Sequence, residues 1–96
     1  MLPSEALKKH QIFIRETVRK YHASSPRLFG SVLTSEDTKN SDLDILVEPT
    51  DKTSLLDLAK IECALSERLG VEVDVLTPDF LDPSFRDEVL RTAMPI

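Results

Sequence analysis

Two aspartates, Asp42 and Asp44, are separated by a single residue, and ten residues separate Asp42 from an upstream Gly30-Ser31 pair. Side chains two positions apart on a β-strand project from the same face, about 6.6 to 7 Å apart, so these two carboxylates converge on one site if the segment is a strand. A third aspartate, Asp74, lies within a later apolar run. The pattern indicates metal-assisted phosphoryl chemistry.

Paired carboxylates are the groups that hold two divalent cations about 3.5 to 4 Å apart in phosphoryl-transfer sites. Mg²⁺ suits such a site because it prefers oxygen ligands and binds through one or two carboxylates plus substrate phosphates. We therefore predict that Asp42 and Asp44 bind two Mg²⁺ ions. If the strand of Asp74 lies beside them, that carboxylate either completes the metal site or takes the proton of the attacking group as general base.

The Gly-Ser pair is typical of a turn that receives an anion. Gly30 permits close backbone approach and an unusual φ, while Ser31 offers a hydroxyl and an amide, so a nucleoside triphosphate is the expected occupant. An isolated strand aspartate more often faces solvent, and aspartate is depleted in strands. The combination of an aspartate pair, a Gly-Ser turn and a third strand aspartate favours the site over that simpler interpretation.

These residues must be positioned by strands, and the surrounding pattern predicts where the strands lie. A short strand over Arg27–Phe29 ends at Gly30, and a polar loop leads to a second strand over Asp42–Val47. In that second strand Leu43, Ile45 and Val47 share one face, opposite to the aspartates. A third strand is expected over Val71–Leu76, with Asp74 on the face of Glu72.

Helices are predicted before, between and after these strands. Helical spacing indicates one helix from Ser4 to about His22, and the clearest helix runs from a cap at Thr53 or Ser54 to Gly70. Asp82 as cap and Pro83 as first residue begin a last helix that reaches about Thr92. Phe85, Val89 and Ala93 are expected to face inward. Phe80, Leu81 and Phe85 are assigned to the core, with a partner surface as the alternative, and Met94–Ile96 forms a tail or an added strand. The fold class is α/β (α+β).

Composition sets the class of protein. The chain has 96 residues, of which 41% are hydrophobic and 30% are charged, which predicts one globular domain over residues 1–96, with a partner subunit or oligomer plausible at this size. A net charge of −5 makes nucleic acid a poor partner. The single cysteine, Cys63, excludes an intrachain disulfide. Without a long apolar run or a signal peptide, no membrane association is expected and a cytoplasmic location is predicted.

The motif resembles a known signature. Phe29-Gly30-Ser31, ten residues, then Ser41-Asp42-Leu43-Asp44 is similar to the Gly-Ser and Asp-x-Asp signature of the DNA polymerase beta nucleotidyltransferase superfamily. The order of elements along nearly the whole chain is similar to that of the minimal nucleotidyltransferase (MNT) antitoxin family, which is encoded beside HEPN ribonuclease toxins.

That resemblance implies a small, palm-like mixed sheet with helices on one face, and the use of ATP with Mg²⁺. By position, Asp42, Asp44 and Asp74 would be the catalytic and metal-binding residues, and Gly30 and Ser31 would contact the nucleotide. The implied activity is transfer of AMP from ATP to a tyrosine of a cognate HEPN toxin, as in a type VII-like toxin-antitoxin system.

Two alternatives remain open at the level of sequence. Many relatives carry an arginine directly after Gly-Ser and a glycine three residues further on, where this chain has Val32 and Ser35. A degenerate binding module that neutralises its toxin by docking is therefore one alternative, and a small-molecule nucleotidyltransferase is the other. The candidate replacements for the phosphate-binding arginine are Arg27, Lys39 and Lys52.

Overall fold

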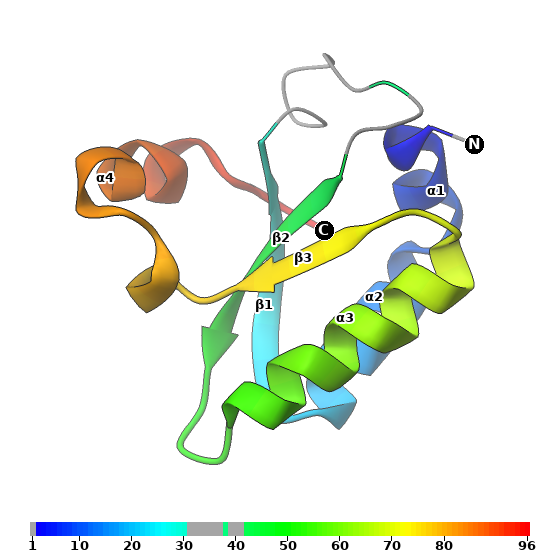
Figure 1. Cartoon of the computed structure of the whole chain (residues 1–96), viewed down its shortest axis with the longest axis horizontal. Helices are drawn as coiled ribbons and strands as arrows, with labels where there is room; N and C mark the ends of the chain where they lie inside the picture. The colour runs from blue at the N-terminus through cyan, green and yellow to red at the C-terminus, as the bar shows by residue number, and fades with distance from the viewer. Residues whose placement is uncertain (1, 31–37, 39–41) are drawn as a thin grey trace.

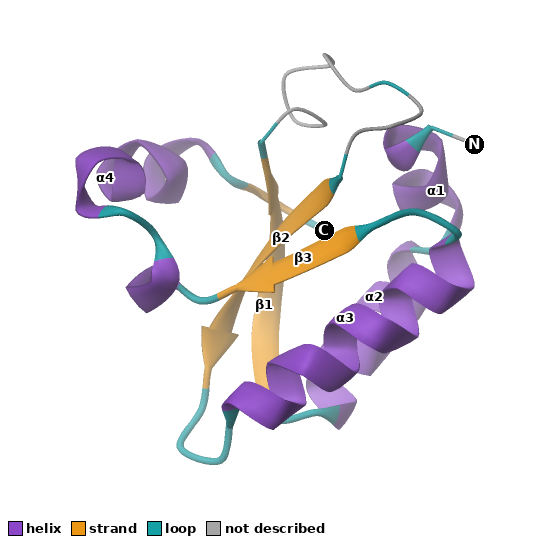
Figure 2. Cartoon of the chain, viewed as in Figure 1, coloured by secondary structure: helices purple, strands orange, loops and turns teal. Residues whose placement is uncertain are grey.

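The fold is a four-stranded mixed sheet with helices against it (Figures 1 and 2). The computed structural model describes residues 2–30, 38 and 42–96. Among them the strands are arranged in the order β3-β2-β1-β4, where β1 is antiparallel to both β2 and β4, and β2 is parallel to β3. The predicted α/β class with a small mixed sheet is confirmed. The elements are α1 (Pro3–Lys9), α2 (Gln11–Lys20), β1 (Ala23–Phe29), β2 (Leu43–Pro49), α3 (Leu55–Leu69), β3 (Val73–Leu76), the 3-10 turn η1 (Pro78–Phe80), α4 (Pro83–Thr92) and β4 (Met94–Pro95).

The amino-terminal helix is divided in two. His10 leaves helical geometry, with φ −119° and ψ 25°, so that it ends α1 and begins α2. The prediction of one continuous helix was wrong because the apolar spacing continues across His10 without a glycine or proline to mark the break. The division lets both segments bury apolar residues, with Ala6 on α1 and Ile14 and Val18 on α2 fully or almost fully buried.

β1 begins four residues earlier than predicted. The segment Ala23-Ser24-Ser25-Pro26 has the composition of a helix breaker, yet Ala23 and Ser24 pair with Pro49 and Glu48 of β2. The pairing register shifts between Ser24 and Arg27, and Ser25 adopts a positive φ of 49°, so the strand carries a bulge. Pairing with β2 overrides the local turn preference of these residues.

The unit β2-α3-β3 contains the segments best predicted from sequence. A reciprocal cap begins α3, in which the Asp57 amide donates to Ser54 Oγ at 3.1 Å and the Ser54 amide donates to Asp57 Oδ2 at 3.0 Å. Gly70 ends the helix with φ 73°, as expected for a left-handed cap. Strand β3 then lies parallel to β2, which places the two aspartate strands side by side.

The two faces of the sheet are covered differently. Helices α1, α2 and α3 pack on the face that presents Leu43, Ile45 and Val47, which are completely buried. On the other face a smaller cluster joins Phe29, Leu46 and Leu81 with partly buried residues of α4. The expectation of helices on one face alone is thus corrected, because α4 packs on the second face.

The carboxyl-terminal segment departs from prediction in its exposure. Asp82 and Pro83 begin α4 as predicted, and Val89 and Ala93 pack against the second cluster. Phe85 was expected to face inward, but it is 44% exposed, and Phe80 is also exposed, whereas Leu81 is buried. Met94 and Pro95 form β4, the added strand that the sequence left open. Within the described residues, no helix combines the length and apolar character that crossing a bilayer demands.

Candidate active site

The predicted site residues gather at one end of the sheet. Asp44 is the second residue of β2 and Asp74 the second residue of β3, and the two are direct partners in the parallel register. Asp42 immediately precedes β2, and Gly30 immediately follows β1, whose last residue Phe29 is the antiparallel partner of Asp44. The assumed adjacency of the two aspartate strands is confirmed. Ser31 lies outside the described residues.

Gly30 makes room for the carboxylate of Asp44. A Cβ atom built on Gly30 would lie 2.3 Å from Asp44 Oδ2 and 3.2 Å from its carboxyl carbon, and the φ of Gly30 is 82°. Both the left-handed backbone and the close approach require glycine at this position. The residue was predicted to admit a nucleotide. In the structure, the side chain of Asp44 packs against the backbone of Gly30.

The three carboxylates form an electrostatically strained group. Burial, with the negative charges of Asp74 and Asp42, raises the pKa of Asp44 to about 6. Burial also raises the pKa of Asp74, with further contributions from the charge of Asp42, the charge of Glu62 and a hydrogen bond with Asp42. Such mutual repulsion is expected of carboxylates that lie near one another at one end of a sheet.

The donor set fits an oxygen-preferring divalent cation by its chemistry. Carboxylate oxygens are ligands that Mg²⁺ prefers, and a bound cation would reverse the rise in the pKa values of Asp44 and Asp74. In the described part of the chain, no three His, Cys, Asp or Glu side chains are already arranged around a point where a metal ion would sit. Asp42 and Asp74 interact through charge and a hydrogen bond, Asp44 interacts with both through charge, and the three side chains would turn toward a cation on binding.

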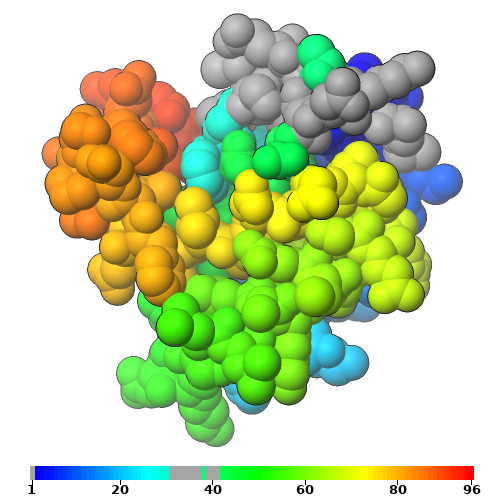
Figure 3. Space-filling view, viewed as in Figure 1, coloured from blue at the N-terminus to red at the C-terminus, as the bar shows by residue number. Residues whose placement is uncertain are grey.

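Two residues of α3 hold the strand that carries Asp74. Strand β3 is at the edge of the sheet, and its outward amides donate to α3 side chains: Val73 to Ser66 Oγ at 3.1 Å and Val75 to Glu62 Oε2 at 2.8 Å. Figure 3 shows α3, in yellow-green, directly against the yellow β3. Sequence reasoning missed Glu62 and Ser66, although their spacing of four residues places them on one side of the helix.

The candidate phosphate-binding cations differ in their position. Arg27 lies on the face of Asp44, but its Nη2 donates to Glu48 Oε1 at 2.6 Å, so an ion pair already engages it. Lys52 follows the far end of β2, beyond Pro49, and is thus excluded from the carboxylate end. Lys39 lies outside the described residues, as do Val32 and Ser35.

A family model agrees with this geometry. Residues 11–93 match the model of the nucleotidyltransferase domain. The chain belongs to the nucleotidyltransferase domain family. It is a nucleotidyltransferase, as its motif predicted, and the matched residues include Gly30 and all three aspartates.

A relative in Methanocaldococcus jannaschii, provisionally named protein adenylyltransferase MJ0435, is 40% identical to this chain over 77 residues. The aligned part covers 80% of this chain and 83% of the relative. A second protein of that organism, provisionally named protein adenylyltransferase MJ1217, is 40% identical over 73 residues. The aligned part covers 76% of this chain and 71% of that protein.

Solved structures share the fold. One provisionally described as a minimal nucleotidyltransferase has a TM-score of 0.86 and 36% identity, and the match covers 97% of this chain and 95% of that one. A toxin-antitoxin crystal structure with AMP-PNP has a TM-score of 0.73, covering 93% of this chain and 72% of that one. At 21% identity the second likeness shows the fold alone.

Proposed function

We propose that this nucleotidyltransferase transfers AMP from ATP to a tyrosine hydroxyl of a partner protein. The observation that carries the proposal is that Asp44 and Asp74 are register partners on adjacent parallel strands. The Asp44 carboxylate also lies against Gly30, and the chain belongs to this family. Relatives named protein adenylyltransferases support a protein as acceptor. The partner would be a HEPN-type toxin, and the shared fold of a toxin-antitoxin structure is consistent with that role.

The transfer makes one bond to the α-phosphorus and breaks one, and the acceptor hydroxyl loses its proton. The acceptor oxygen attacks the α-phosphorus of ATP, the bond from that phosphorus to the bridging oxygen of the β-phosphate breaks, and pyrophosphate leaves. Asp42 and Asp44 would hold two Mg²⁺ ions, with Asp74 as a third ligand. When bound, these ions supply electrostatic stabilisation of the phosphate charge.

Residues of the chain would bind the phosphates of ATP and accept the proton of the attacking hydroxyl. Gly30 and Ser31 would lie against the phosphates, where the absence of a side chain on Gly30 permits a close approach. Asp74, the register partner of Asp44, would serve either as the third ligand of the Mg²⁺ ions or as the acceptor of the proton of the attacking hydroxyl. Asp44, which is half-buried against Gly30, would have its charge balanced by the bound cations.

The test is transfer of label from α-labelled ATP to a HEPN-type toxin protein, in the presence of Mg²⁺. The double variant Asp42→Asn, Asp44→Asn should lower the rate by at least about a hundredfold, because charge stabilisation at the phosphates is lost. The matched control is Asp51→Asn with Asp79→Asn, which makes the same change of charge at two exposed aspartates away from the site. The control should retain the wild-type rate.

Full labelling by the double variant would contradict the proposed roles of Asp42 and Asp44. Absence of labelling by the wild-type protein would contradict transfer to this acceptor. If the double variant still neutralised the toxin while labelling was lost, docking rather than transfer would be the neutralising event.

A further inference from the structure

A groove lies at the other end of β1, between that strand and α2. It has a volume of about 380 Å³ and is bordered by Arg15, Val18 and Arg19 of α2, by residues 23–27 of β1, and by Pro95 and Ile96. Ser24 lies five residues before Phe29, the partner of Asp44, which is roughly 16 Å along the strand. None of Gly30, Asp42, Asp44 and Asp74 lines the groove.

The edge of β1 beside the groove is open among the described residues. Strand β4 pairs only with Arg27 and Leu28, and the last backbone bond on this edge joins the Ile96 amide to the Pro26 carbonyl at 3.0 Å. Within the described sheet, Ser24 and Ser25 thus have no strand neighbour on the β4 side, and both are exposed. An extended peptide placed here would continue the line of β4, next to the bulge at Ser25.

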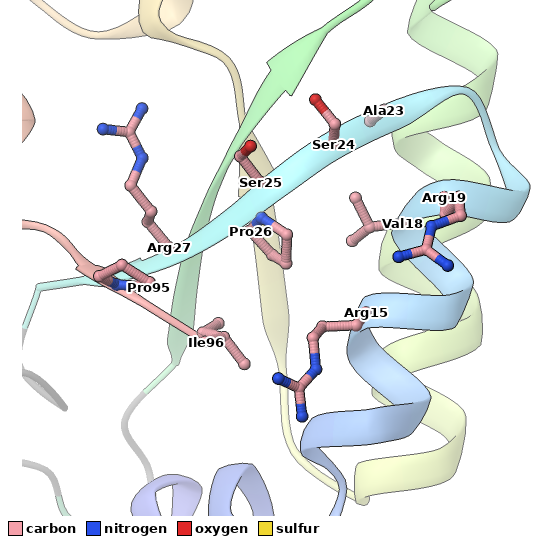
Figure 4. Close-up of a pocket in the computed structure, with 10 residues that line it drawn as sticks. All are labelled: Arg15, Val18, Arg19, Ala23, Ser24, Ser25, Pro26, Arg27, Pro95 and Ile96. Carbon is pink, nitrogen blue, oxygen red and sulfur yellow. The ribbon is translucent and has the colours of Figure 1, made fainter.

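Two guanidinium groups give the groove its charge. Arg15 and Arg19 lie one helical turn apart, are exposed, and make no ion pair with any described residue. Figure 4 shows both extending from α2 on the groove side, while Arg27 points away from them. No aspartate or glutamate of the described chain borders the groove, although the chain as a whole carries a charge of −5. Exposed guanidiniums of this kind pair with carboxylates in a two-pronged geometry.

The floor of the groove is apolar. Val18 is 1% exposed, and Ile96 packs against the helical core. Pro26 and Pro95 add further apolar surface. The combination of an apolar floor with two cations matches a peptide in which acidic and aliphatic side chains alternate, because alternate residues of an extended chain face opposite ways.

We propose that this groove binds an extended acidic segment of a protein partner, whose backbone lies beside Ser24 and Ser25 and whose carboxylates pair with Arg15 and Arg19. Nucleic acid is a weaker candidate because the surrounding protein is acidic. The site is distinct from the one that would bind ATP, so binding here and transfer of AMP can be measured separately.

The test is a nuclear magnetic resonance titration of the isotope-labelled protein with a capped octapeptide of alternating valine and glutamate. Saturable shifts are expected at the amides of Ser24 and Ser25 and at the side chains of Arg15 and Arg19. The double variant Arg15→Ala, Arg19→Ala should weaken binding at least about tenfold, as expected when charge-assisted hydrogen bonds are lost. Lys8→Ala with Lys9→Ala removes the same charge from exposed positions on α1 and should leave binding unchanged.

Three results would overturn the proposal: no saturable binding, equal binding to the Arg15 and Arg19 variant, or equal binding of a peptide with glutamine in place of glutamate. If ATP or inorganic phosphate shifted the same signals with the affinity of the peptide, the groove would be a general anion site and the peptide assignment would be wrong. The titration contains no AMP acceptor. Failure of the transfer assay would therefore not change what the titration shows about the groove.

Discussion

Asp44 is the residue on which the site depends most. It contacts Gly30, is the register partner of both Phe29 and Asp74, and carries a charge that burial and two neighbouring carboxylates disfavour. A half-buried carboxylate in such surroundings costs stability whenever it is ionised without a cation. The fold therefore keeps an unfavourable group where it is useful for binding a positive charge.

The first prediction concerns the pH dependence of stability without metal. The pKa of Asp44 in the folded protein is about 6, above its ordinary value of 3.8, so its protonated form favours folding. This contribution is complete below 3.8 and is lost as the pH rises through about 6. Denaturant unfolding in a metal chelator should show a loss on the order of 1 kcal/mol, after allowance for solvent screening. Asp44→Asn should remove this loss, and an unchanged pH profile would show that other groups cause it.

The second prediction compares the two glycines with positive φ. Alanine at either position should cost about 1 to 2 kcal/mol, because both backbones are left-handed. A Cβ atom on Gly70 would have no neighbour within 4 Å, whereas at Gly30 the Asp44 carboxylate must move aside. Gly30→Ala should therefore abolish AMP transfer, while Gly70→Ala retains it at a temperature where both are folded. Equal activity of the two variants would contradict the role of the Gly30 contact.

At the scale of single residues, the sequence predicted which residues belong to the site and on which strands they lie. The spacing of Asp42 and Asp44 and the apolar run around Asp74 indicated the two strands, but their adjacency was an assumption that the parallel register of β2 and β3 confirms. The contact between Gly30 and the Asp44 side chain could not be predicted, because it depends on the antiparallel register of β1 and β2. The contributions of Glu62 and Ser66 depend likewise on how α3 packs along β3.

Among the elements, β3 illustrates how an edge strand is held without a further strand. Its two outward amides are satisfied by side chains of α3, and Asp74 lies between them. A helix that satisfies the strand amides in this way also fixes the position of the strand along its length. The position of Asp74 relative to Asp44 therefore depends on α3 as well as on the pairing of β3 with β2.

The third prediction tests this support at Glu62. Glu62→Ala removes the acceptor for the Val75 amide and should cost about 0.5 to 1.5 kcal/mol, with faster amide exchange at Val75. Glu62→Gln keeps an acceptor oxygen and should preserve both stability and slow exchange. Glu67→Ala is the matched control, since Glu67 is exposed on the same helix. Equal exchange rates at Val75 in the two Glu62 variants would contradict the role of this hydrogen bond.

Elements with local signals were predicted well, and those set by distant contacts were not. Ser54 and Gly70 defined α3, and Asp82 and Pro83 defined the start of α4. The break at His10 and the early part of β1 have no such signal, since packing and pairing with β2 decide them. The exposure of Phe85 was predicted wrongly because the spacing of apolar residues along a helix does not reveal how much of the helix the sheet covers.

The whole molecule carries a charge of −5, and five of its twelve basic residues lie in the first 20 positions. At the carboxylate end of the sheet, the nearby Arg27 is already paired with Glu48, and Lys52 lies beyond the opposite end of β2. A triphosphate would be repelled there unless divalent cations accompany it.

The fourth prediction follows from this charge distribution. ATP with Mg²⁺ should raise the midpoint of thermal unfolding by on the order of 10 °C near saturation, because ligand binding stabilises the folded state by about 2.7 kcal/mol at a hundred times the dissociation constant. ATP with a chelator should produce little change. The shift should vanish in the Asp42→Asn, Asp44→Asn variant, and a full shift in that variant would place the nucleotide elsewhere.

The side chains that satisfy β3 have a consequence for behaviour at high concentration. An open strand edge is a template on which other chains add, and such growth leads to fibres. Glu62 and Ser66 occupy the donors on one edge, while the other edge ends in a two-residue strand that contains Pro95. Loss of Glu62 would therefore expose a template for strand addition, and the Glu62→Ala protein should form fibres under conditions in which the wild-type protein stays dispersed.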